Sequence, residues 1–159
     1  MNKHKMKPED KKSRSAGLKE LAYELKDAFD AVSPFIEKHT AIVCPECRQV
    51  CCRDKHGRSD ENDLIFLRAL GVEMPDGPPE RGESEPCRFL TETGCSLQRW
   101  MRPFRCTFFF CDPLLKSLEN DNAKLYRAFV QYFQHLVSVR RRLLESQAVP
   151  DVDLPRLYL

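Results

Sequence analysis

The sequence lacks a long apolar segment. No stretch approaches the roughly 20 consecutive apolar residues that a transmembrane helix needs. Residues 1–10 carry charges, but no apolar run follows them as it would in a secretory signal. These absences predict a cytoplasmic protein with no membrane partner.

The chain also lacks a surplus of one charge, because 26 Lys and Arg residues stand against 24 Asp and Glu residues for a net charge of +2. Proteins dedicated to nucleic acid usually carry a clear basic excess, so nucleic acid is not an expected partner. No glycine-rich nucleotide-binding loop is evident, and no constellation of serine, histidine and acid stands out. The sequence therefore predicts no catalytic residue and leaves open whether the protein is an enzyme.

What the sequence does contain is a cluster of cysteines, all of them between residues 44 and 111. Clustered thiols in a reducing compartment hold metal more often than they form disulfides. All eight cysteines are therefore candidate metal ligands. They are Cys44, Cys47, Cys51, Cys52, Cys87, Cys95, Cys106 and Cys111.

The spacing of Cys44 and Cys47 is that of a metal knuckle, in which two intervening residues let both sulfurs reach one ion. Zinc takes four such ligands in tetrahedral geometry. Iron–sulfur clusters also take four cysteines, often from similar spacings. The expected metal is therefore zinc or iron, with an iron–sulfur cluster as one form of the latter.

Cys51 and Cys52 are consecutive, and consecutive side chains of an extended chain point apart. The pair could serve two separate sites, one of them could bridge a binuclear centre, or one could be a buried thiol. Several nearby arginines could offset the charge of a thiolate site as hydrogen-bond donors, or could simply face solvent. These arginines are Arg48, Arg53, Arg88, Arg102 and Arg105.

Amphipathic helices are predicted on both sides of the cysteine segment. Apolar residues recur at three- and four-residue steps from about Ser15 to His39 and again from about Ala123 to Gln147. Pro34 lies near the end of the first helix and is expected to kink or restart it, because proline has no backbone donor and crowds the preceding turn.

Shorter elements are predicted between these helices. Ser59 or Asp60 can cap a helix over 64–70, and Gly71 is a natural end for it. Proline and glycine make residues 71–86 a loop.

Two short extended pieces, 87–90 and 95–97, should follow that loop, joined by a turn over 91–94. Asp112 and Pro113 then form an N-cap and first-turn pair for a further helix.

The predicted fold class is therefore mainly α. It is a small domain whose irregular, cysteine-rich, metal-binding middle is clamped between an N-terminal helix and a long C-terminal helix. Residues 1–15 are expected to form a disordered basic tail, 16–147 a single cysteine-cluster domain, and 148–159 an irregular C-terminal tail.

Several of these features occur in a recognisable order. The Cys-x-x-Cys knuckle and the Cys51-Cys52 pair precede an Asp-led helix start at Asp60 or Asp63. Then come Cys87-Arg88-Phe89-Leu90, Gly94-Cys95, and Arg102-Pro103 before Cys106. In combination, over residues 44 to about 111, they resemble the YkgJ-like (CxxCxxCC) family of cysteine-cluster proteins, which is named for zinc or iron chelation. The resemblance implies metal binding through the cysteines, with no assigned downstream role.

The chain departs from the family pattern at two places. Three residues separate Cys47 from Cys51, where the family usually has two, and Thr107 follows Cys106 where the family has arginine. Flagellin lysine N-methylases carry a similar cluster. The alternative that the resemblance implies is therefore an iron–sulfur enzyme, or an enzyme accessory, related to protein lysine methylation.

Overall fold

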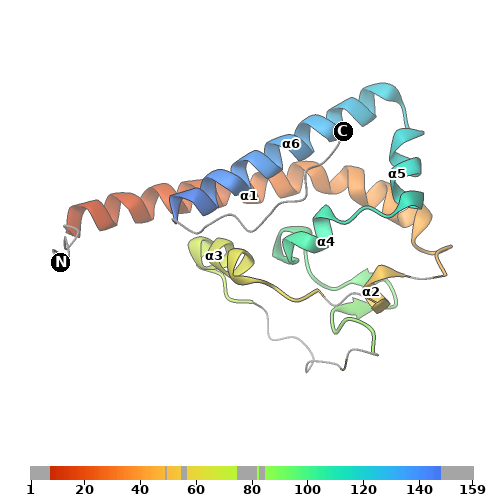
Figure 1. Ribbon diagram of the computed structural model, residues 1–159, viewed down its shortest axis with the longest axis horizontal. Coiled ribbons are helices and arrows are strands. Elements are labelled where there is room, and N and C mark those ends of the chain that lie inside the picture. Colours follow the sequence, from red (N-terminus) through yellow and green to blue (C-terminus); the bar gives the residue numbers. More distant parts are fainter. Residues whose placement is uncertain (1–7, 49, 55–56, 75–81, 83–84, 148–159) are drawn as a thin grey trace.

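The computed structural model is mainly helical, as the sequence predicted. Its two longest helices, α1 (Pro8–Val43) and α6 (Ala123–Ser146), pack along each other (Figure 1). None of the described helices has both the length and the apolar character that a membrane span requires. The structure describes residues 8–48, 50–54, 57–74, 82 and 85–147.

The apolar stripes of α1 and α6 meet in the main core. Leu25 and Val32 of α1 and Leu136, Val139 and Leu143 of α6 are each at most 1% exposed. These positions recur at three- and four-residue steps, so each stripe keeps one face of its helix against the partner. Burial of these side chains is the main source of stability for the helix pair.

α1 begins earlier and ends later than the sequence predicted. It starts at Pro8, so part of the expected tail over 1–15 is helical. Residues 1–7 and 148–159, the remainder of the two expected tails, lie outside the described residues.

α1 does not restart at Pro34, because the helix continues through this residue to Val43. Pro34 removes the amide that would bond the carbonyl of Asp30. Both residues are exposed, so water can satisfy that carbonyl at little cost.

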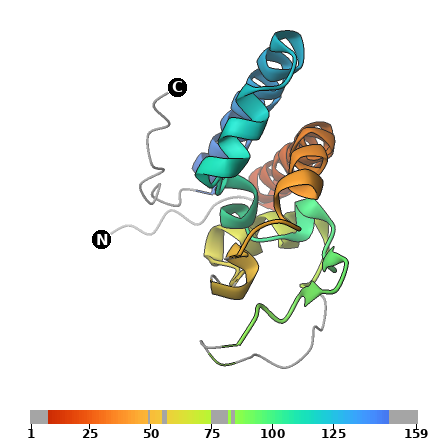
Figure 2. The same cartoon turned by 90° about the vertical axis from the view of Figure 1, so that its right-hand side faces the viewer.

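The cysteine-rich middle lies along one side of the helix pair and is not clamped between the two helices, which contact each other directly (Figures 1 and 2). Short elements make up this middle. They are α2 (Cys51–Asp54), α3 (Glu61–Leu70), β1 (Leu90–Thr91), β2 (Gly94–Cys95), the 3₁₀ helix η1 (Arg99–Met101), α4 (Phe104–Phe108) and α5 (Asp112–Glu119).

α3 has well-defined ends. The Asp60 side chain accepts a hydrogen bond from the Asp63 amide, and the Asp63 side chain accepts one from the Asp60 amide, which makes a reciprocal capping box. Gly71 ends the helix with a positive φ of 73°, a conformation that glycine adopts without strain.

The predicted extended pieces form a minimal antiparallel hairpin, in which Leu90 lies opposite Cys95 and Thr91 opposite Gly94. Gly94 supplies the positive φ, here 113°, at the turn. The hairpin region has a small core of its own, separate from that of the helix pair. Its residues are Cys87, Phe89 and Leu97, with Leu90, Cys95 and Met101 packed against them.

Aromatic rings near the last two cysteines anchor the middle to the helix pair. Phe104 packs edge-on against Phe29 of α1, and Phe110 packs edge-on against Phe129 and Phe133 of α6. The segment that carries Cys106 and Cys111 is therefore held against the main core by apolar contacts.

Candidate metal centre

All eight cysteines lie in the described part of the chain and none is in a disulfide. Cys87 is buried, Cys106 is exposed, and the others are half-buried. They come from different elements, so their grouping depends on tertiary structure.

The first cysteine set gathers at the end of α1. The amide of Cys44 donates to the Thr40 carbonyl at 2.9 Å, and the amide of Cys47 donates to the Cys44 carbonyl at 3.2 Å, which turns the chain back on itself. Burial raises the pKa of Cys44, and the nearby charges of Cys51, Cys111 and Cys47 raise it further. Such effects weaken with distance, so these four thiols lie in the same region of the fold. The first cysteine set is Cys44, Cys47, Cys51 and Cys111.

The second cysteine set gathers around Gly57 and the hairpin. A methyl group at Gly57 would lie 3.1 Å from the Cys106 sulfur and 3.8 Å from the Cys87 sulfur, so both sulfurs face the same point of the backbone. The amide of Cys87 also donates to the Cys52 carbonyl at 2.8 Å. The second cysteine set is Cys52, Cys87, Cys95 and Cys106.

The pKa values of Cys52 and Cys106 depend on the charges of other cysteines of the second set, which agrees with this grouping. Although the Cys106 residue is exposed as a whole, partial loss of water around its thiol raises its pKa to about 11, with further contributions from the charges of Cys95 and Cys87. The pKa of Cys52 is also raised, by a hydrogen bond to the Cys51 side chain, by burial, and by the charges of Cys51, Cys106 and Cys95. The raised pKa values favour the neutral thiol at Cys52 and Cys106.

Cys51 and Cys52 lie in α2, a single helical turn, and not in the extended chain that the sequence analysis assumed. Successive side chains on a helix do not share a face. Cys51 contributes to the first set and Cys52 to the second. A hydrogen bond between their side chains connects the two sets.

In the part of the chain that the structure describes, no three or more Cys, His, Asp or Glu side chains come close enough together to hold a metal ion. The two sets are therefore neighbourhoods of sulfur atoms and not formed coordination spheres.

The arginines near the cysteines differ in their placement. Three of them are exposed and face solvent, which was one of the two roles expected for these arginines. They are Arg48, Arg53 and Arg105. Arg88 lies over the Phe89 ring, with 4.6 Å between its guanidinium carbon and the ring centroid. Arg102 donates from Nε to the Leu97 carbonyl at 2.9 Å, and its charge lowers the pKa of Cys106.

Sequence reasoning missed Arg99, which is 6% exposed and lies in η1 against α1. Its charge lowers the pKa of Cys44 in the first set. The charges of Cys95 and Cys106 in the second set act in turn on the pKa of Arg99. Arg99 is thus coupled to both sets.

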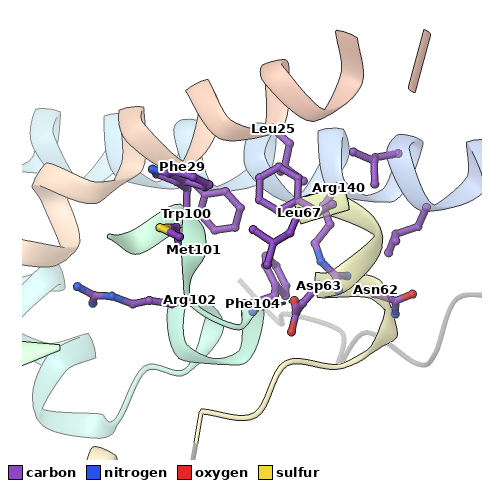
Figure 3. Close-up of a pocket in the computed structure, with 13 residues that line it drawn as sticks. Leu25, Phe29, Asn62, Asp63, Leu67, Trp100, Met101, Arg102, Phe104 and Arg140 are labelled. Carbon is purple, nitrogen blue, oxygen red and sulfur yellow. Dashed lines mark hydrogen bonds between the residues drawn. The ribbon is translucent and has the colours of Figure 1, made fainter. Parts of the chain in front are cut away.

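A buried acidic residue links α3 to the segment that carries Cys106. The Asp63 carboxylate accepts a 3.0 Å hydrogen bond from the amide of Phe104, the first residue of α4 (Figure 3). Burial raises the pKa of Asp63, whereas the hydrogen bond from Phe104 and the charge of Arg140 lower it. Arg140 stacks on the Phe104 ring, with 4.2 Å between its guanidinium carbon and the centroid.

These three side chains line a cavity beneath α1 and α6, together with Leu25, Leu67 and Trp100 (Figure 3). The cavity contains none of the cysteines. Asp63 acts on the second set by fixing where α4 begins, and its charge also raises the pKa of Cys106.

The structure also brings together a serine, a histidine and an acid that the sequence analysis did not recognise. His39 Nδ1 lies 2.8 Å from Ser117 Oγ, and His39 Nε2 lies 3.1 Å from Asp121 Oδ2. Lys38 Nζ lies 2.6 Å from the same carboxylate oxygen. None of these residues lines the cavity in Figure 3. The contacts tie the end of α1 to α5 and to the connection before α6.

Comparison of the chain with protein-family models, with curated proteins and with solved structures found no match. The resemblance to the YkgJ-like cysteine-cluster family therefore depends on the residues of the chain itself.

Proposed function

We propose that this chain is a metal-binding protein that holds one metal centre in the first cysteine set and another in the second. The metal is zinc or iron, and for iron an iron–sulfur cluster is included. Four thiolates suit a tetrahedral zinc ion and equally suit an iron–sulfur cluster. The resemblance to the YkgJ-like family points to the same chemistry.

The observation that carries this proposal is the division of the eight cysteines into two groups of four, with Cys51 and Cys52 on opposite sides of the division. Both kinds of centre take four thiolates, so neither group has a missing or surplus ligand. A cysteine sulfur moves between staggered positions by rotation about χ1, so the sulfurs of one neighbourhood can converge on an ion.

Anaerobic purification followed by analysis of metal and acid-labile sulfide tests the proposal. We expect either two zinc ions per chain without sulfide, or iron together with sulfide. Protein that carries neither metal after purification from metal-replete cells, and that binds neither on reconstitution, would refute the function.

Paired substitutions test the division. Cys44→Ser with Cys47→Ser should remove about half of the bound metal, and Cys87→Ser with Cys95→Ser should remove the other half. Ser96→Ala, next to Cys95 and exposed, is the matched control and should retain all of it. Loss of all metal from either double variant would indicate one shared centre with a bridging cysteine.

A further inference from the structure

Gly57 lies beside two cysteine sulfurs that come from distant parts of the chain. A methyl group on this residue would lie 3.1 Å from the Cys106 sulfur and 3.8 Å from the Cys87 sulfur. The two sulfurs are therefore separated by no more than the sum of these distances, about 7 Å. Since no group of three possible ligands forms among the described residues, the structure presents these sulfurs as a pair.

The backbone conformation of Gly57 does not require glycine. Its φ lies outside the left-handed region, unlike those of Gly71 and Gly94. Alanine would therefore suit the backbone at this position, but its Cβ would crowd the Cys106 sulfur at 3.1 Å. What the absent side chain provides at Gly57 is room beside the two sulfurs.

Backbone hydrogen bonds hold both cysteines in place. The Cys87 amide donates to the Cys52 carbonyl at 2.8 Å, and the Cys87 carbonyl accepts from the Leu90 amide at 2.9 Å. The Cys106 amide donates to the Pro103 carbonyl at 2.8 Å. Rotation about χ1 moves each sulfur between staggered positions without breaking these bonds.

We propose that Cys87 and Cys106 are a thiol–disulfide pair, which a small-molecule disulfide converts to an intramolecular bond beside Gly57. This inference goes beyond the proposed function and requires no metal, although metal in the second set would protect both sulfurs. Cys106 is exposed and Cys87 is buried, so the reagent reaches Cys106 first.

The reaction consists of two exchange steps. The Cys106 thiolate attacks the small-molecule disulfide, which forms a mixed disulfide on Cys106 and releases one small thiol. The Cys87 thiolate then attacks the Cys106 sulfur and releases the second small thiol. Two protein thiols are thereby oxidised, one small-molecule disulfide is reduced, and the two protons are taken up by the released thiols. The raised pKa of Cys106 slows the first step but does not change its products.

The experiment exposes the reduced full chain to oxidised glutathione with a chelator present, and peptide mass spectrometry then maps the disulfides after the remaining thiols are alkylated. The wild type should yield a peptide in which Cys87 is joined to Cys106. Cys87→Ser should accumulate glutathione on Cys106, because the second step is blocked. Cys106→Ser should leave the buried Cys87 without glutathione.

Gly57→Ala tests the geometry of the pair. Its methyl group crowds the Cys106 sulfur, so the bond should form at least about tenfold more slowly, because misplaced reacting atoms lose effective concentration. Gly17→Ala is the matched control, because a methyl group there meets no atom within 4 Å. It should form the bond at the wild-type rate.

A wild type in which Cys87 and Cys106 both remain thiols would overturn the proposal, and so would bonds that join either of them to another cysteine instead. This mapping uses the unaltered chain and does not depend on whether a variant folds. Equal rates for Gly57→Ala and Gly17→Ala would also overturn it. The chelator keeps the test independent of the proposed metal binding.

Discussion

The carboxylate of Asp63 bonds the backbone amide of Phe104 at 3.0 Å, across 41 residues of sequence. The same side chain also closes the capping box of α3 with the Asp60 amide. One buried carboxylate thus sets the start of two helices, and the second of these carries Cys106.

Replacing Asp63 by asparagine should destabilise the protein by about 1–3 kcal/mol, because one of the carboxylate oxygens becomes an NH₂ group and a buried amide loses its acceptor. Urea denaturation followed by circular dichroism measures this change. Glu61→Gln, in the same turn but exposed, is the control and should cost less than about 1 kcal/mol. Equal effects of the two substitutions would contradict the role assigned to Asp63.

Leu136→Ala should cost about 2–5 kcal/mol, because Leu136 is 0% exposed in the core between α1 and α6 and the truncation leaves a cavity. Leu125→Ala makes the same chemical change on the same helix, but Leu125 is 42% exposed. Its effect should be within about 0.5 kcal/mol, as for most surface substitutions. Thermal or urea unfolding of both variants checks the packing of the two helices.

The contact between α1 and Asp121 should stabilise the folded protein at neutral pH and lose this effect in acid. A hydrogen bond from Lys38 is the main reason that the pKa of Asp121 is lowered from 3.8 to about 2 in the folded protein. A lowered pKa means that the folded state prefers the carboxylate. This contribution is therefore complete above pH 3.8 and is lost as the pH falls from 3.8 towards about 2.

Unfolding measured across this pH range, with a chelator present throughout, tests the contribution of Asp121. The stability of the wild type should fall more steeply than that of Asp121→Asn, which has no charge to lose. Glu119→Gln, exposed on the neighbouring helix α5, should follow the wild type. Parallel curves for the wild type and Asp121→Asn would exclude the contact as a source of stability.

Metal removal should loosen the middle of the chain and leave the helix pair intact. The hairpin has only a small core of its own, so metal binding would supply much of the free energy that orders it. Hydrogen exchange with and without a chelator measures this difference. The amides of Cys87 and Ser96, which donate to Cys52 and Phe89, should lose protection. The amides of Leu136 and Val139 should keep theirs, and their simultaneous loss would contradict independent packing of α1 and α6.

The elements that the sequence predicted well are those with local signals. α6 has both an apolar stripe and an N-cap at Asn122, and the predicted and observed helices both begin at Ala123. α3 ends at Gly71, as its sequence indicated. Asp112 was expected to cap α5, yet Cys111 occupies that position and Asp112 is the first helical residue.

What the sequence did not reveal depends on contacts between distant segments. α2, η1 and α4 are too short to show a periodic pattern, and their geometry is imposed by packing. The burial of Arg99 cannot be read from its neighbours, since arginine usually faces water. His39 was placed in the first helix correctly, but Ser117 and Asp121, its partners, lie about 80 residues later. The division of the cysteines is equally non-local.

The order of the two cysteine sets along the chain has a consequence for assembly. The segment from Cys52 to Cys106 lies wholly inside the segment from Cys51 to Cys111, so the two sets close nested loops. Once the first set is drawn together, Cys52 and Cys106 at the ends of the inner segment are already near each other, and only Cys87 and Cys95 remain to be brought in. Under the proposed function, the first closure would therefore lower the entropic cost of the second, and the topology of the chain would favour filling both sets over filling one.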